Sequence, residues 1–294
     1  MVLVLAASQM AQAGDTLRLL TWGGYAPEEV IALFEAESGH SVEVTLSNNE
    51  EMIAKLRATA GGGFDLAQPS QDRIAGPQAE LGIYKPMDLT QIDASQFITS
   101  MLEATKTNTT VDGEIYGVPH VWGTSGLVLD TTAAASVKDY TDLCSDEVAG
   151  KVSYRLKRPT LIGFAFAMGL DPFAAYGDEA AYSEIMDQVE AKLIECKPNV
   201  KTYWGGGDEL MNLIRSGEVV ASMAWDTGGW KLNGEMPNVT FVAPASGALG
   251  WIDTFVLPAK GRADEAAYDW INFVMRPEIS AMITSSAGNF TASK

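Results

Sequence analysis

The stretch DTLRLLTWGGYAPEEVIALFEAESGHSVEVTL, residues 15–46, decides the fold. Its apolar run at 17–20 predicts a strand, and a glycine-containing turn follows at 22–25. Pro27 and the two glutamates after it open a helix whose apolar residues recur at helical spacing until a Ser-Gly pair closes it. Residues 42–46 alternate as a second strand. This order is typical of an α/β sheet, in which ligands bind beyond the carboxyl ends of strands.

The same alternation of short apolar runs and helical patterns continues along the chain, which predicts two α/β units with the chain passing between them. The apolar run at 115–121 is expected to end before Trp122, and a separate strand is expected at 127–129. Helices are expected at 48–60, 139–143, 160–170, 179–195 and 265–275, and further strands at 64–67, 151–154, 219–224, 241–243 and 255–257.

Length and charge limit the classes of protein that the chain can represent. With 294 residues it exceeds the usual size of a single core, so two lobes are expected. The formal charge of −18 has the same sign as a phosphate backbone, which excludes nucleic acid as an expected partner. An acidic surface also draws cationic solutes toward a cleft, although acidity serves solubility alone in many proteins.

Residues 1–13 have the apolar and cleavage parts of a secretory signal, because Ala11-Gln12-Ala13 fits the small-x-small rule. The basic start of such a signal is missing, so a short apolar strand is the alternative. No later stretch approaches the roughly 20 apolar residues of a membrane span. We therefore expect a periplasmic protein after processing.

Cys144 and Cys196 are the only two cysteines in the sequence. In an exported protein such a pair predicts a disulfide, and the alternative is two unpaired buried thiols. The sequence has two histidines, His40 and His120, and neither a CxxC nor an HExxH motif. It therefore predicts no transition-metal site and no cofactor.

Three segments combine a tryptophan with small residues, and two of them add an aspartate. Their tryptophans are Trp22, Trp225 and Trp251, each expected in a loop that follows a strand. Asp226 follows Trp225 directly, and Asp253 lies two residues after Trp251. Aromatic faces attract organic cations and an aspartate pairs with an ammonium group, so converging segments of this kind would form a cage for an amine.

Seven segments in order resemble the periplasmic spermidine/putrescine-binding proteins, the solute receptors of polyamine ABC importers. The resemblance extends from about Leu17 to Thr291 and implies a two-lobed type II periplasmic-binding fold with hinge crossovers. The expected lobes are residues 15–119 with 249–294, and residues 120–248. The segments are LLTWGGY (19–25), NNEEMIAKL (48–56), FDLAQPS (64–70), VPHVWG (118–123), MAWD (223–226), WID (251–253) and INFVMRPE (271–278).

The resemblance also implies which side chains bind the ligand. Trp22 and Tyr25 would supply an aromatic wall, and Ser70 a polar contact. The tryptophans at 225 and 251 would sandwich the methylene chain, while Asp253 would pair with an amine. Asp226 is expected to contribute as well, or else to cap a helix or fix a turn. Asn289 stands where the family has a tyrosine after a glycine.

One stretch departs from the family pattern. The second acidic anchor of the family falls in the segment that here reads Arg155-Leu156-Lys157-Arg158. With Lys157 and its basic neighbours at the ligand, one end of a diamine would be repelled, and a zwitterion such as an ω-amino acid would fit both ends. Alternatively, these side chains point to solvent and Asp208 or Glu209 replaces the missing acid. The resemblance further implies helices after Lys294.

The expected function is capture of a polyamine-type amine of the putrescine or spermidine class, without catalysis. An exported α/β enzyme is less favoured, because no nucleophile or base with an orienting partner stands out. A ferric receptor would call for an adjacent tyrosine pair, which the sequence lacks.

The triple glycines that begin at residues 61 and 205 lack the lysine and the Ser or Thr of a phosphate-binding loop. They predict flexible turns, and neither is expected to lead a strand into a helix. The expected partners of the monomer are a small organic amine and a membrane permease.

Overall fold

The computed structural model describes residues 14–294, which divide into two compact units. Among the described residues, unit 1 contains 14–122 together with Ile252–Lys294, and unit 2 is Gly123–Trp251. The lobe boundaries near residues 119 and 249 that the sequence predicts remain a prediction. The predicted signal segment, residues 1–13, lies outside the described residues.

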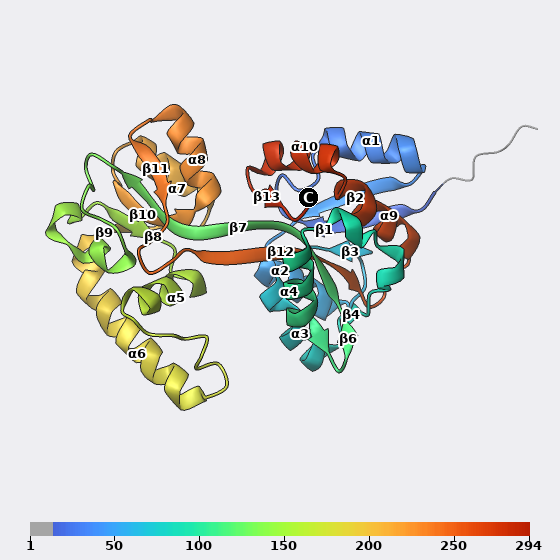
Figure 1. Ribbon diagram of the computed structural model, residues 1–294, viewed down its shortest axis with the longest axis horizontal. Helices are drawn as coiled ribbons and strands as arrows, with labels where there is room; N and C mark the ends of the chain where they lie inside the picture. Colours follow the sequence, from blue (N-terminus) through green and yellow to red (C-terminus); the bar gives the residue numbers. More distant parts are fainter. Residues whose placement is uncertain (1–13) are drawn as a thin grey trace, which may run out of the picture. The chain divides into compact units, whose positions relative to one another are not determined.

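Unit 1 takes its strands and helices from both ends of the chain (Figure 1). Its strands are β1 (Thr16–Thr21), β2 (Ser41–Leu46), β3 (Leu66–Ala67), β4 (Tyr84–Lys85), β5 (Thr110–Val111), β6 (Glu114–Ile115), the first part of β7 (Gly117–Asp130), most of β12 (Leu249–Pro258) and β13 (Phe290–Thr291). Its helices are α1 (Glu28–Ser38), α2 (Asn49–Ala58), α3 (Ala75–Leu81), α4 (Thr99–Asn108), α9 (Asp264–Val274) and α10 (Pro277–Ala287).

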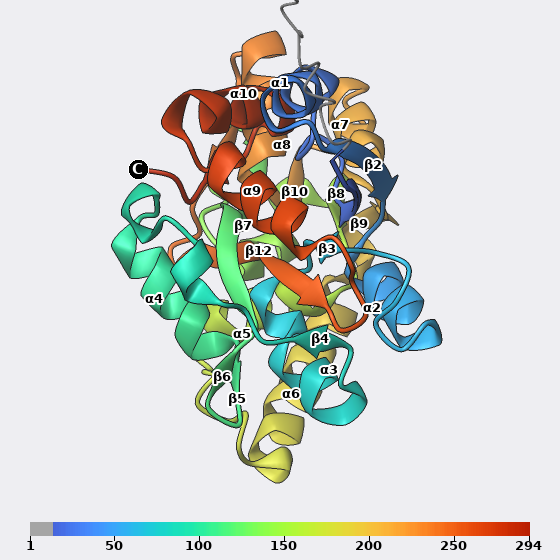
Figure 2. The same cartoon turned by 90° about the vertical axis from the view of Figure 1, so that its right-hand side faces the viewer.

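The sheet of unit 1 has the strand order β2-β1-β3-β12-β7, and β1 is parallel to both of its neighbours. Leu17, Leu19 and Leu20 of β1 are fully buried, because helices cover both faces of the sheet. Helices α1 and α10 lie on one side, and α2, α3 and α4 lie on the other (Figures 1 and 2). The predicted strand-helix-strand start is confirmed. Helix α1 ends at Gly39, whose φ of 77° is a left-handed conformation that favours glycine.

Unit 2 is a continuous segment with its own sheet and core. Its strand order is β7-β10-β8-β9, and β11 also pairs with β7. Tyr140, Tyr154 and Phe164 are among its largest buried side chains. The strands are β8 (Val152–Tyr154), β9 (Val200–Tyr203), β10 (Ala221–Trp225) and β11 (Val239–Val242). The helices are α5 (Arg158–Ala167), α6 (Glu179–Cys196), α7 (Gly207–Arg215) and α8 (Asp226–Glu235).

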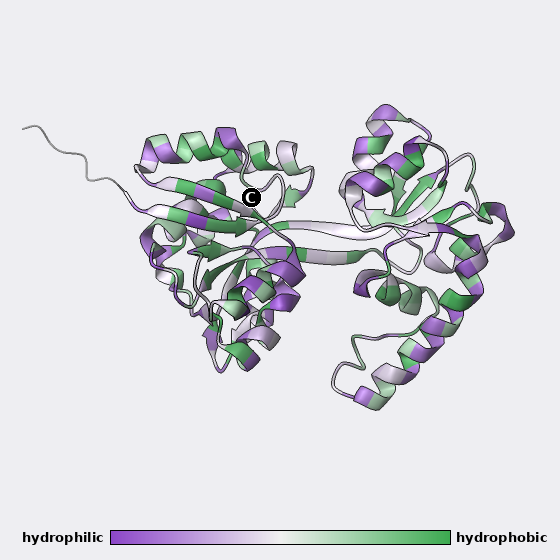
Figure 3. Cartoon of the chain, turned by 180° about the vertical axis from the view of Figure 1, so that it is seen from behind, coloured by the Kyte–Doolittle hydropathy of each residue, from purple (hydrophilic) through white to green (hydrophobic). Residues whose placement is uncertain are grey.

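Helix α6 has 18 residues and carries polar and apolar residues in alternation along its length (Figure 3). Val189 and Cys196 face the core of unit 2 and are buried, while its acidic residues are exposed. This is the pattern of a helix that packs one face on a core. None of the helices in residues 14–294 is both long and apolar enough to span a bilayer.

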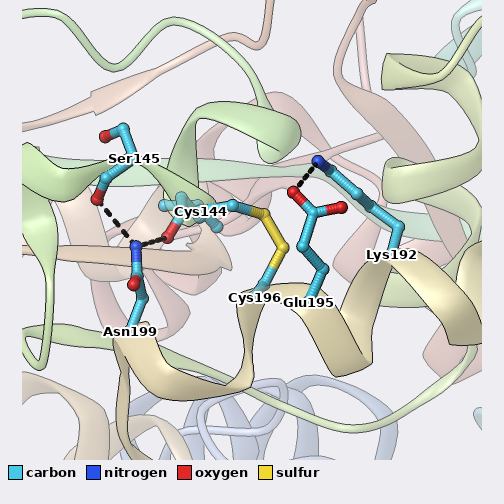
Figure 4. Close-up of a disulfide and its surroundings, with 7 residues drawn as sticks. Cys144, Ser145, Lys192, Glu195, Cys196 and Asn199 are labelled. Carbon is cyan, nitrogen blue, oxygen red and sulfur yellow. Dashed lines mark hydrogen bonds and ion pairs between the residues drawn. A yellow bond between two sulfur atoms is a disulfide. The ribbon is translucent and has the colours of Figure 1, made fainter.

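A disulfide joins Cys144, at the end of a 3₁₀ helix (Tyr140–Cys144), to Cys196 at the end of α6 (Figure 4). The two Cα atoms are 4.5 Å apart. Beside the bridge, the Asn199 amide donates to the carbonyls of Leu143 and Ser145 at 3.0 and 2.7 Å. The bridge and these hydrogen bonds fasten α6 to the segment before β8.

The structure corrects the predicted break after residue 121, because β7 continues without interruption from Gly117 to Asp130. Its glycines serve close packing rather than turning. A Cβ on Gly123 would lie 2.5 Å from Cζ2 of Trp251, and one on Gly126 would lie 2.7 Å from Cζ of Phe241. An aromatic ring occupies the space that a side chain would need at each position.

Two further predictions are wrong, and one helix was not predicted. Trp251 and Asp253 lie within β12 and not in a loop after a strand, so the strand predicted at 255–257 begins earlier, at Leu249. The glycines at 205–207 do lead β9 into α7. Helix α8 was not predicted because it contains three glycines; one of them, Gly229, lies so close to Phe241 that a Cβ would be 2.5 Å away.

Candidate functional site

Asp253 is the centre of a buried polar cluster in unit 1. Its side chain is on β12 and the residue is only 4% exposed. One carboxylate oxygen accepts a hydrogen bond from Ser70 Oγ at 2.5 Å, and the other accepts one from the Tyr25 hydroxyl at 2.6 Å. Ser70 and Asp253 also form a backbone bridge, and Thr254 N donates to the Pro69 carbonyl at 2.9 Å. Backbone pairing therefore places these side chains together.

The Asp253 carboxylate has hydroxyl partners but no cationic one among the described residues of the chain. Burial raises its pKa to about 6, because the lost hydration outweighs the two hydroxyl hydrogen bonds, and the negative charge of Asp72 adds to the increase. An ionised carboxylate in this environment is unfavourable unless a positive charge approaches it. The cluster is thus suited to a cation.

Asn49, which the sequence did not single out, holds Ser70 in place. Its amide donates to Ser70 Oγ at 2.9 Å, and its carbonyl oxygen accepts from Ser70 N at 2.9 Å. Asn49 is the first residue of α2 and belongs to the matched segment at 48–56. Its place in that segment could have identified Asn49 as a site residue. An asparagine beside the N-cap Asn48, however, is also typical of the start of an ordinary helix.

Trp22 and Tyr25 lie in the turn after β1, as predicted. The indole N–H of Trp22 donates to the Gln68 carbonyl at 2.7 Å, which fixes the ring against the end of β3. Gly24 in this turn has a φ of 86°, and a Cβ there would lie 2.9 Å from the Ala287 Cα. The turn therefore admits only glycine at that position.

His120 is fully buried and so does not line a surface. Its ring stacks on Phe255 with centroids 4.3 Å apart and meets the Tyr25 ring edge-on at 5.6 Å. Its Nδ1 pairs with the Gln68 amide, and burial lowers its pKa to about 3. The neutral imidazole thus supports the Tyr25 ring.

Asn289 lies in unit 1 between α10 and β13, after Gly288, whose φ of 77° ends α10. It is partly buried. Next to it, Phe290 stacks on Trp122 with ring centroids 4.9 Å apart, and the Trp122 indole donates to the Thr291 carbonyl at 3.1 Å. Trp122 was not among the predicted site residues.

In unit 2, Trp225 belongs to a second cluster, at the end of β10. The Trp204 ring packs edge-on against it with centroids 5.2 Å apart. The Arg155 guanidinium lies over both rings, 5.4 Å from the Trp225 centroid and 5.9 Å from that of Trp204. Trp204 is buried and is part of this cluster.

Asp226 begins α8 and is 3% exposed. One of its oxygens accepts from Thr124 N and Oγ1 at 2.8 and 2.9 Å, and the other accepts from Thr227 N at 2.8 Å. These bonds fasten the start of α8 to β7, which is the turn-fixing role considered for this residue. Close by, the Trp251 ring covers Gly123.

Lys157 is exposed and caps α5 through its backbone, since its carbonyl accepts from Thr160 N at 3.0 Å. Of the basic stretch, Arg155 is the residue whose side chain the structure places on Trp225. Of the predicted site residues, Tyr25, Ser70 and Asp253 form the cluster of unit 1, and Trp225 belongs to the cluster of unit 2.

Replacing Gly123 by Ala is expected to displace the Trp251 ring and to lower the free energy of unfolding by roughly 1–3 kcal/mol, as overpacking does. Denaturant melts and tryptophan emission would measure both changes. Gly234→Ala is the matched control, because this exposed α8 glycine has nothing within 4 Å of its Cβ position. Equal stability and emission for both variants would show that Trp251 does not pack on Gly123.

Known proteins resemble the chain over nearly its whole length. The spermidine/putrescine-binding periplasmic protein 1 of Haemophilus influenzae is 28% identical over 96% of this chain and 76% of its own. The spermidine/putrescine-binding periplasmic protein of Escherichia coli is 27% identical over 95% of this chain and 78% of its own. A solved spermidine/putrescine ABC transporter substrate-binding protein from Streptococcus pneumoniae has a TM-score of 0.78 at 22% identity, with 95% of this chain and 83% of that one covered.

The structural likeness confirms the predicted fold class, a type II periplasmic-binding fold of two α/β units joined by crossover strands. The family assignment comes from the sequence. The profile of the bacterial extracellular solute-binding proteins matches residues 29–294, which is most of the chain. That family consists of solute receptors and not of enzymes, and the chain belongs to it.

Proposed function

We propose that this chain is the periplasmic receptor of an ABC importer and that its solute is a linear organic amine of the polyamine type. The names of its relatives support the transport role and the class of solute. The observation that carries the proposal is the buried Asp253 carboxylate, whose partners are two hydroxyl groups. A primary ammonium group would supply the missing positive charge.

The proposed contacts are made by the site residues that the sequence predicts. Tyr25 and Ser70 hold the carboxylate while it binds the ammonium. Aromatic rings at Trp22, Trp225 and Trp251 would cover the methylene chain of the amine. Asn289 and Lys157 remain proposed contacts, and Asp226 is proposed to act through the strand and helix that it joins.

We also propose that units 1 and 2 are the lobes of the receptor and that solute binding closes them by a hinge. Closure would present the liganded form to a membrane permease, with the receptor a monomer that does not bind nucleic acid. Small-angle scattering with and without the bound amine would measure compaction, and light scattering would measure the mass. An unchanged radius of gyration at saturation would contradict closure.

A thermal-shift panel followed by calorimetry tests the solute class, because a ligand that binds only the folded state raises the melting temperature. Putrescine, cadaverine, spermidine and butylamine form the amine set, and 1,4-butanediol is the uncharged control. We expect at least one amine of the set, or a compound derived from one of them, to bind. We expect the diol not to bind. Stabilisation by non-amines alone would contradict the proposal.

Amine affinity is expected to fall as the pH drops through about 6. Only the ionised Asp253 attracts an ammonium, and its pKa in the ligand-free protein is raised to about 6, so affinity should fall roughly tenfold per pH unit below that value.

The stability of the ligand-free protein should change in the opposite direction. Between about 6 and the ordinary value of 3.8 the folded state binds a proton that the unfolded state does not, so acidification stabilises it.

Calorimetry and denaturant melts at several pH values would measure these opposite trends. The Asp253→Asn variant is the control, because it lacks the titrating group and should show neither. Affinity that stays level between pH 7 and pH 5 would exclude Asp253 as the ammonium partner.

A further inference from the structure

Gln68 is a fully buried residue directly after β3, and each of its polar groups is hydrogen-bonded within unit 1. Its backbone N–H donates to the Leu20 carbonyl at 3.0 Å, and its own carbonyl accepts from the Trp22 indole at 2.7 Å. In the side chain, the amide oxygen accepts from the Thr21 hydroxyl, and the amide nitrogen lies 2.5 Å from His120 Nδ1. Gln68 thus connects the end of β1 and the turn after it with β7.

Gln68 also fixes the position of the proton on the buried His120 ring. Because its amide oxygen accepts from Thr21, its amide nitrogen faces the imidazole and donates to Nδ1. A neutral imidazole that accepts at Nδ1 has its proton on Nε2. Among residues 14–294, that Nε2 atom has no hydrogen-bond partner. Within the described chain, Gln68 is therefore the group that orients this ring by a hydrogen bond.

The His120 ring in turn sets the position of Tyr25. Phe255 and Asp253 are two residues apart on β12, so their side chains leave the same face of the strand. His120 stacks on Phe255 with centroids 4.3 Å apart, and the Tyr25 ring meets the imidazole at 5.6 Å and at a right angle. From this position the Tyr25 hydroxyl donates to Asp253 at 2.6 Å. A line of contacts therefore leads from Gln68 to the carboxylate.

We propose that Gln68 is a positioning residue of the amine site: it orients His120, and through that ring it places the Tyr25 hydroxyl on the Asp253 carboxylate. The inference rests on the proposed function, because it takes Asp253 as the ammonium partner. Gln68 does not touch the amine itself. Its effect on binding is transmitted by Tyr25, which keeps the carboxylate ionised.

The pH at which amine binding weakens is the quantity that this role changes. Burial raises the pKa of Asp253 to about 6, and the hydrogen bonds from Ser70 and Tyr25 oppose that increase. Without the Tyr25 bond the pKa should rise further, so amine affinity should start to fall at a higher pH. Asp72, whose negative charge also acts on Asp253, is kept in every variant below.

Gln68→Met removes both side-chain hydrogen bonds and keeps the length of the side chain. Calorimetry with putrescine and spermidine between pH 5 and pH 8 should place the fall in affinity about half to one pH unit higher than in the wild type. At pH 7 the affinity should be roughly two- to tenfold weaker. Tyr25→Phe should move the fall by a similar amount, and Gln68→Met should add no further shift to Tyr25→Phe.

Gln78→Met is the matched control. Gln78 is a partly buried glutamine of α3 in unit 1, and its side chain accepts from Tyr84 N at 2.8 Å. Its replacement also removes a glutamine hydrogen bond, so it should lower stability without moving the pH at which affinity falls. A variant that only destabilises unit 1 would behave in the same way.

Nitrogen NMR of the imidazole rings gives a second measurement that needs no ligand, because the chain has only two histidines, His40 and His120. In the wild type, His120 should have its proton on Nε2. Gln68→Glu keeps the size of the side chain and the acceptor for Thr21, so it serves also if Gln68→Met does not fold. A carboxylate cannot donate, so this change should move a proton to Nδ1 of His120.

Two results would overturn the role of Gln68 while the amine receptor stands. One is an unchanged pH dependence in Gln68→Met, or a shift that is as large in the Tyr25→Phe background as in the wild type. The other is a wild-type His120 with its proton on Nδ1. Failure of the wild type to bind any amine would instead overturn the proposed function, and the His120 signals would still test its contact with Gln68.

Discussion

Replacement of Asp253 by Asn is expected to lower the affinity for the amine by roughly 3–5 kcal/mol, because a buried cation is left without its charged partner. The side chain keeps its size, so the fold is expected to persist. The ligand-free variant should be at least as stable as the wild type near pH 7, since burial of an ionised carboxylate is avoided. Calorimetry measures the affinity, and thermal melts measure the stability.

Asp112→Asn is a suitable control for this change. Asp112 is an exposed residue of unit 1 in the turn between β5 and β6, and its φ of 52° is a conformation that asparagine tolerates. The control removes the same charge and should leave affinity within experimental error. If Asp253→Asn also bound the amine as tightly as the wild type, the carboxylate would not be the ammonium site.

Removal of the disulfide by the double replacement Cys144→Ser and Cys196→Ser should lower the free energy of unfolding of unit 2 by about 4 kcal/mol. The bridge closes a loop with a sequence separation of 52, and without it the unfolded chain gains the entropy of that loop. Denaturant melts would measure the loss. Binding should persist below the new transition, since neither cysteine belongs to the Asp253 or Trp225 cluster.

The wild-type chain treated with a reductant is the matched control and should show the same loss as the double variant. A reductant should not change the double variant itself. A loss well below 1 kcal/mol in both experiments would mean that the hydrogen bonds of Asn199 to Leu143 and Ser145 hold the two segments together on their own.

Local patterns were enough to predict the elements that are regular along the chain. Helix α1 has acids in its first turn and a glycine after its end, and β1 has a continuous apolar run, so both were placed correctly. Helix α8 was missed because it contains three glycines, and one of them, Gly229, is required by the close approach of Phe241, a contact that no local pattern records. The same cause explains why β7 was divided at Gly123.

The candidate site depended still more on contacts between distant residues. Tyr25 and Asp253 are separated by 228 positions, and their hydrogen bond was not predicted, although both side chains were expected at the ligand. The sequence could not show which of Arg155 and Lys157 packs on an aromatic ring, because both are basic and they are two residues apart. Packing on Trp204 and Trp225 distinguishes them, and neither ring is near Arg155 in sequence.

The insertion of unit 2 within unit 1 has a consequence for the order in which a ribosome delivers the two. Unit 2 is one uninterrupted segment, so its core and both of its cysteines are complete before residue 252 is made. Unit 1 must wait, because β12, α9 and α10 come from the last part of the chain. Domains generally fold as units. Tyr25 and Ser70, although translated early, therefore meet Asp253 only near the end, and the carboxylate cluster is among the last features of the protein to form.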